Sequence, residues 1–142
     1  MTAKRVTSAK GEQLPTAGEL RLLHVLWQMG EATVEEIVTA HPSRSRPNYK
    51  TTQTLLRIME EKRFITHKNR GRVFVFMPLV SRDTVDRRSV RMLLSQNFGG
   101  SATGLLLNLL EAAPVKEEEL DELEAQIRAY RKRSDSNGRV RT

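Results

Sequence analysis

Four side chains that can donate or accept hydrogen bonds share one side of a helix predicted between Asn48 and Lys62. With Lys50 as origin and about 100° per residue, all lie within about 60° of it. They are Lys50, Gln53, Thr54 and Arg57. Arginine can grip a guanine edge or a phosphate, lysine suits phosphate, and glutamine can pair with adenine. This face therefore predicts contacts in the DNA major groove, with a merely solvated helix surface as the alternative.

Further polar residues flank the start of this helix. Arg44 and Arg46 precede it and Tyr49 opens it, where phosphates commonly meet a helix N-terminus. Thr51 lies toward the apolar side of the helical wheel, but at the helix start its hydroxyl can still reach a phosphate. We expect these residues to extend the DNA-binding surface.

A β-hairpin with a basic tip is predicted directly after the helix. Its strands are Phe64 to Lys68 and Val73 to Met77, with a turn over 69–72 in which Gly71 can take a positive φ. The tip carries Lys68, Arg70 and Arg72. These side chains can enter a minor groove or grip its backbone, although a hairpin tip can also be charged for solubility alone.

Two capped helices precede this region and must position it. Thr16 and Glu19 form a capping-box pattern before a first helix that stops at Gly30, and Thr33 and Glu36 repeat it before a second helix ending near Ala40. The order helix, helix, helix, hairpin predicts a winged helix-turn-helix. The expected fold class is mainly α with a small β-hairpin wing, followed by a helical dimerisation region.

The second half of the chain carries apolar faces that it cannot cover by itself. A fourth helix to about Asn97 precedes a helix that is apolar almost all round its axis. A last helix has a seam at a/d-like spacing. A homodimer is the best use for these faces, and the residues expected in it are Leu105, Leu106, Leu109, Leu110, Leu120, Leu123, Ile127 and Tyr130.

The positive charge of the chain is concentrated in its first half. The formal net charge is +7, and residues 1–80 hold 13 Lys/Arg against 7 Asp/Glu, whereas residues 81–133 hold 9 of each. This excess favours an anionic partner. The expected organisation is an N-terminal disordered arm at 1–13, a winged-helix DNA-binding domain at 14–80, a helical dimerisation domain at 81–133 and a disordered tail at 134–142.

Patterns that support catalysis or metal binding are missing from the sequence. There is no cysteine, and His24, His41 and His67 share no metal-ligand spacing. No Gly-rich phosphate loop or nucleophile elbow is found. We therefore expect no enzyme, cofactor or metal. No apolar run approaches the ~20 residues that span a bilayer, which predicts a cytoplasmic protein without membrane insertion.

The sequence resembles the BlaI/MecI penicillinase-repressor family of winged-helix regulators. The resemblance covers roughly Leu14 to Lys132 and is most specific in YKTTQTLLRIMEEK, from Tyr49 to Lys62. Supporting pieces are ELRLLHVLW from Glu19 to Trp27, a wing ending in Phe76, and FGGS from Phe98 to Ser101.

This resemblance implies a homodimeric transcriptional repressor that binds a short palindromic operator in double-stranded DNA. It also implies relief of repression through a membrane sensor metalloprotease and cleavage in the dimerisation region. The matching position here is Asn108-Leu109, where the family usually has phenylalanine after the asparagine.

Two other functions remain open from the sequence alone. The basic half could serve a non-specific architectural nucleic-acid-binding protein that contacts phosphates only. The winged helix could also contact another protein, as an adaptor. Replacement of Gln53 and Arg57 separates a base reader from a phosphate binder, because only the former loses its preference between sites.

Overall fold

The computed structural model describes residues 13–41 and 47–136 of the chain. It divides into two compact units, Met1–Leu93 and Leu94–Thr142. The division falls inside helix α4 (Arg82–Asn97), whereas the change in charge places a boundary after residue 80. The start of α4 belongs to the first unit because Val85 is buried and Arg82 contacts the ring of Trp27.

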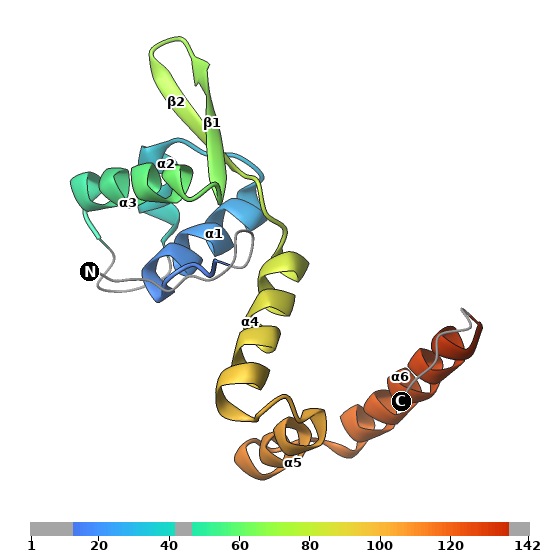
Figure 1. Ribbon diagram of the computed structural model, residues 1–142. Helices are drawn as coiled ribbons and strands as arrows, with labels where there is room; N and C mark the ends of the chain where they lie inside the picture. The colour runs from blue at the N-terminus through green and yellow to red at the C-terminus, as the bar shows by residue number, and fades with distance from the viewer. Residues whose placement is uncertain (1–12, 42–46, 137–142) are drawn as a thin grey trace. The chain divides into compact units, whose positions relative to one another are not determined.

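The first unit has the element order of a winged helix-turn-helix. Three helices, α1 (Ala17–Met29), α2 (Val34–Ala40) and α3 (Tyr49–Glu61), precede two strands, β1 (Ile65–Arg70) and β2 (Val73–Pro78). Figure 1 shows the two strands as a ribbon that projects from the three helices. The predicted fold class, mainly α with a β-hairpin wing, is confirmed.

Local sequence sets where the helices begin. The Thr16 side chain accepts a hydrogen bond from the Glu19 amide at 3.2 Å, and the Glu19 carboxylate accepts one from the Thr16 amide at 2.9 Å. Thr33 and Glu36 form the same capping box at α2. Each cap stabilises its helix by about 0.5–2 kcal/mol. Asn48 caps α3 through its side chain, which accepts from the Thr51 amide at 2.8 Å.

The core of the first unit lies between the inner faces of its helices and the base of the hairpin. Its fully buried apolar side chains come from every element. They include Leu22, Leu23, Leu26, Ile37, Leu56, Met59, Phe64 and Ile65. Because Leu56 and Met59 are held in this core, the opposite face of α3 is fixed toward the solvent.

The hairpin is longer than its sequence predicts. The strands pair antiparallel from Ile65↔Pro78 to Arg70↔Val73, so the turn shortens to Gly71 and Arg72. Gly71 has a φ of 66°, the positive value expected there. The predicted end of the first strand at Lys68 is therefore wrong, because Asn69 pairs with Phe74 and Arg70 with Val73, although asparagine is a poor strand former.

The segment between α1 and α2 is fastened to the outer edge of β2. The Ala32 amide donates to the Phe76 carbonyl at 2.9 Å, and the Phe76 amide donates to the Ala32 carbonyl at 2.8 Å. Gly30, with a φ of 85°, ends α1 immediately before this bridge. The bridge pairs one residue with the otherwise open strand edge.

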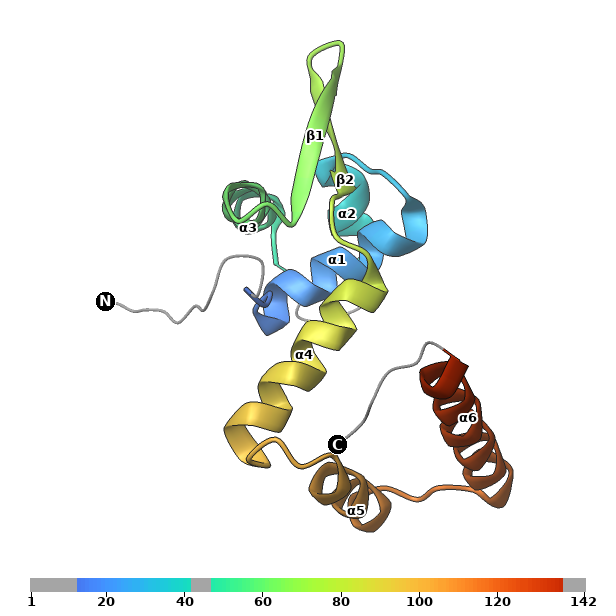
Figure 2. The same cartoon turned by 45° about the vertical axis from the view of Figure 1, so that its right-hand side comes forward.

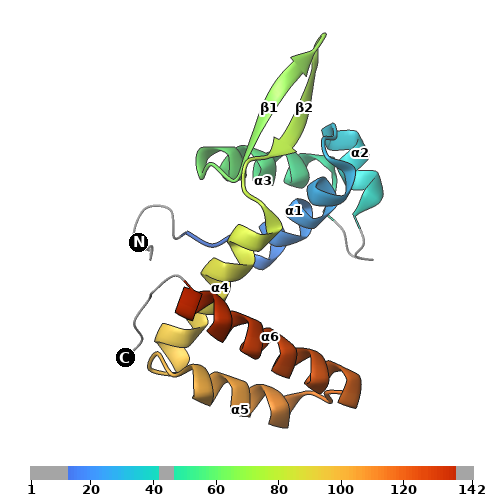
Figure 3. The same cartoon turned by 90° about the vertical axis from the view of Figure 1, so that its right-hand side faces the viewer.

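In the described part of the second unit, further helices follow the end of α4, and Figure 3 draws them. They are α5 (Ala102–Ala112) and α6 (Glu117–Ser136), and neither buries a residue in the single chain. Helix α6 continues to Ser136, whereas the sequence predicts that a disordered tail begins at residue 134. No residue from Ser134 to Ser136 is a proline or glycine that would end a helix. Within the part of the chain that the structure describes, no helix combines the length and apolar character needed to cross a membrane.

Candidate nucleic-acid interface

The outward face of α3 presents the polar side chains that the helical wheel predicts. Lys50, Gln53, Thr54 and Arg57 are all exposed, whereas Thr52, Leu56 and Met59 on the other side are buried. Thr51 is exposed as well, although the wheel places it toward the apolar side. Because Thr51 lies in the first turn of α3, there is no preceding helical turn to cover its side chain. Figure 2 shows α3 nearly end-on beside the base of β1.

A groove with a volume of about 830 Å³ lies between α3, the start of α2 and the hairpin. Six residues predicted to bind DNA line it: Tyr49, Gln53, Thr54, Arg57, Arg70 and Arg72. Seven others, which the sequence did not predict to bind DNA, complete it: Thr33, Val34, Glu35, Glu60, Val73, Phe74 and Phe76. The groove brings helix and wing residues onto one concave surface.

Not every predicted residue lies in this groove. Lys50 and Thr51 are exposed on α3 but do not line it. Lys68 is also outside the groove. Arg44 and Arg46 lie outside the described residues.

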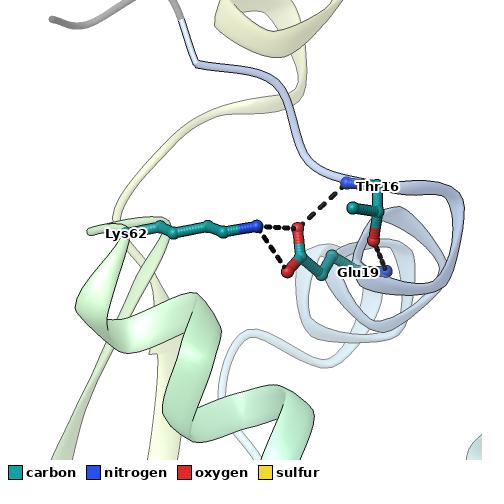
Figure 4. Close-up of polar contacts among 3 residues, drawn as sticks. All are labelled: Thr16, Glu19 and Lys62. Atoms are coloured by element: carbon teal, nitrogen blue, oxygen red, sulfur yellow. Dashed lines mark hydrogen bonds and ion pairs between the residues drawn. The ribbon is translucent and has the colours of Figure 1, made fainter. Parts of the chain in front are cut away.

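A partly buried ion pair ties the end of α3 to the start of α1. The Lys62 Nζ lies 2.8 Å from Oε2 and 3.1 Å from Oε1 of Glu19, whose side chain is only 3% exposed. The same carboxylate accepts from the Thr16 amide, so one group caps α1 and anchors α3 (Figure 4). A carboxylate removed from water needs such partners. The pair thereby fixes where α3 sits.

A second contact joins α3 to the wing. The Nδ1 of His67 lies 2.8 Å from Oε2 of Glu60, and the imidazole stacks on Phe74 with ring centroids 3.9 Å apart. The sequence offered His67 only as a candidate metal ligand and discarded it. Among the described residues, no cluster of three or more metal-ligating side chains is found. His67 instead holds the hairpin against α3.

The exposed cations of the interface differ in their partners. Arg57 pairs with Glu61 at 3.4 Å, and both side chains are about two-thirds exposed. Glu31 pairs with Lys68 at 3.1 Å and with Arg70 at 3.4 Å. Within the described ranges 13–41 and 47–136, Lys50 and Arg72 form no ion pair. Exposed pairs are weak, so all of these cations remain able to meet phosphates.

Comparison with known protein families gives a match over most of the chain. A family model described as "Penicillinase repressor" matches residues 15–129. The chain belongs to this family. As a penicillinase-repressor member it is a DNA-binding transcriptional repressor rather than an enzyme.

Individual relatives cover most of the chain. It is 26% identical over 115 residues to the penicillinase repressor of Bacillus licheniformis, a match that covers 81% of this chain and 90% of that protein. It is 21% identical over 108 residues to the methicillin resistance regulatory protein MecI of Staphylococcus aureus strain N315, covering 76% and 88%. The solution structure of the DNA binding domain of the repressor BlaI is 27% identical, covers 49% of this chain and 85% of that domain, and gives a TM-score of 0.44.

The residues predicted for dimerisation are largely open to solvent in this repressor chain. Leu106, Leu109 and Leu110 are exposed, and so are Ile127 and Tyr130 of α6. Leu105, Leu120 and Leu123 are half-buried. Monomeric proteins rarely leave an apolar helix exposed to solvent on all of its faces.

Proposed function

We propose that this repressor binds a two-fold-symmetric operator as a homodimer, with α3 in the major groove and the wing against the neighbouring backbone. The observation that supports this most is the exposed polar face of α3, which shares one groove with the wing arginines Arg70 and Arg72. The predicted DNA-binding residues and the division into a reading half and a dimerising half are parts of this proposal.

Each residue has a distinct role in the proposed complex. Gln53 and Arg57, near the middle of the face, read base edges through hydrogen bonds. Lys50 and Tyr49 at the helix start, together with Thr51, contact phosphates near the positive end of the helix dipole. Thr54 reaches a base or a phosphate, and the wing cations grip the adjacent backbone.

A mobility-shift titration against duplexes from the promoter upstream of its own gene tests this function. A palindromic duplex should bind more tightly than a scrambled one. Gln53→Ala or Arg57→Ala should reduce the difference in binding free energy between the palindromic and the scrambled duplex by about 1–3 kcal/mol. Lys50→Ala should weaken binding to every sequence and reduce the salt slope by about one. Arg21→Ala, an exposed charge removed from α1, is the matched control.

The outcome also separates the alternative functions. Equal affinity for every duplex at physiological salt would identify a non-specific architectural protein. Absence of duplex binding in the wild type would favour the adaptor function.

We also propose that repression is relieved by cleavage between Asn108 and Leu109. Both residues are exposed, but the bond lies inside α5, where the Asn108 side chain donates to the Gly104 carbonyl at 2.9 Å. Proteolysis therefore requires local opening of α5. Mass spectrometry of the chain from cells with an active target promoter should show a fragment ending at Asn108. An intact chain in those cells would contradict this relief mechanism, including the part of a membrane sensor metalloprotease.

A further inference from the structure

One acidic side chain holds two cations of the wing. The two carboxylate oxygens of Glu31 divide between them, with Oε1 at 3.1 Å from the Lys68 Nζ and Oε2 at 3.4 Å from an Arg70 guanidinium nitrogen. Lys68 and Arg70 are two residues apart on β1 and so project from one face of the hairpin. Glu31 is partly exposed, at 40% of its side chain, and lies within reach of solvent and ligands.

Backbone contacts on both sides of Glu31 hold its carboxylate close to the wing. Gly30 ends α1, and the next residue but one, Ala32, is bound by both of its backbone polar groups to Phe76 of β2. Glu31 stands between these two fixed points. Its position beside the hairpin therefore comes from backbone hydrogen bonds and would persist without the ion pairs.

We propose that Glu31 is an intramolecular substitute for a DNA phosphate, which restrains binding by the wing until a backbone phosphate displaces it. The inference rests on the proposed DNA-binding function and deepens it. A carboxylate and a phosphate oxygen recognise the same guanidinium and ammonium donors. In the free protein, Lys68 and Arg70 are paired with Glu31. The wing therefore attracts duplexes of arbitrary sequence less strongly than its number of cations implies.

The energetics suit a restraint that DNA can overcome. Exposed ion pairs are weak and are screened by salt, so exchange of Glu31 for a phosphate costs little once the reading helix is docked. Phosphate contacts carry no sequence information. Glu31 therefore lowers the affinity for duplexes of any sequence, which reduces loss of the repressor to the many non-operator sites.

Glu31→Gln tests this proposal on the full chain with a short duplex of random sequence. It should bind about three- to tenfold more tightly than the wild type at the same salt concentration. Between about 50 and about 200 mM salt, its slope of log affinity against log salt should be steeper by about one.

Glu35→Gln is the matched control. Glu35 lines the groove and is exposed, but it forms no ion pair within the described parts of the chain. Its replacement changes the net charge by the same amount, so the gain of Glu31→Gln should exceed that of Glu35→Gln. In a background with Lys68→Gln and Arg70→Gln, Glu31→Gln should have no more effect than Glu35→Gln.

The results distinguish failure of this inference from failure of the proposed function. A wild type that binds no duplex overturns the proposed function. A wild type that binds, with Glu31→Gln equal to Glu35→Gln or weaker than the wild type, overturns the role of Glu31 alone. Persistence of the Glu31→Gln gain without the two wing cations does the same.

Discussion

Thr52 belongs to the core of the first unit although both of its neighbours on α3 face the solvent. It is fully buried in the inner face of α3, and its hydroxyl has no hydrogen-bond partner among the described residues. Its neighbours Thr51 and Gln53 are exposed. A buried hydroxyl without a partner destabilises the folded state, because it has lost its bonds to water.

Thr52→Val should therefore stabilise the protein. Valine has nearly the same shape and a similar helix propensity, and it removes the unpaired hydroxyl. We expect the free energy of unfolding to rise by about 1 kcal/mol in urea denaturation followed by circular dichroism. Thr51→Val, at an exposed position, should stay within about 0.5 kcal/mol of the wild type. A less stable Thr52→Val protein would show that the hydroxyl is satisfied in solution.

At the scale of elements, α3 is held by contacts between segments far apart in the sequence. The Glu19–Lys62 pair joins the start of α1 to the end of α3, and the Glu60–His67 contact joins α3 to β1. Together they fix the orientation of α3 relative to α1 and the hairpin. A recognition surface needs such support, because contacts to bases depend on small displacements.

Lys62→Ala should destabilise the first unit by about 1.5–3 kcal/mol, since it leaves a nearly buried carboxylate with one charged partner fewer. Urea denaturation measures the loss. Lys50→Ala, which removes an exposed lysine without an ion pair in the described chain, is the control and should change stability by less than about 0.5 kcal/mol. Equal effects of the two substitutions would show that the partly buried pair contributes nothing specific.

The sequence predicted the elements of the fold better than their contacts. Caps at Thr16 and Thr33 depend on residues three apart, and the inner face of α3 follows from helical periodicity, so both are readable locally. The partners of Lys62, His67 and Glu31 are set by packing between separate elements. No local pattern indicates them, and the apolar part of the groove was missed for the same reason.

Helices α5 and α6 expose apolar side chains that the single chain leaves uncovered. Leu107 is 57% exposed and Tyr130 is 60% exposed, and no residue of either helix is buried. Burial of such surface is favourable at about 25 cal/mol per Å². A second copy of the chain provides a matching surface of the same kind, since a two-fold interface is self-complementary.

Two reading heads in one dimer would recognise two half-sites, so dimerisation should control affinity for a palindrome. Leu106→Glu with Leu110→Glu places charges on one face of α5, four residues apart. Sedimentation velocity should show a monomer at concentrations where the wild type is a dimer. Affinity for a palindromic duplex should fall about 100-fold or more, whereas affinity for a single half-site should not change.

Ala102→Glu is the control for this experiment. It adds a charge to the first turn of the same helix, where the helix dipole favours it, and it removes no leucine. It should leave both the mass and the affinity for the palindrome unchanged. A wild type that sediments as a monomer at every concentration would contradict the homodimer. A monomeric leucine variant that keeps full affinity for the palindrome would instead show that each half-site is bound independently.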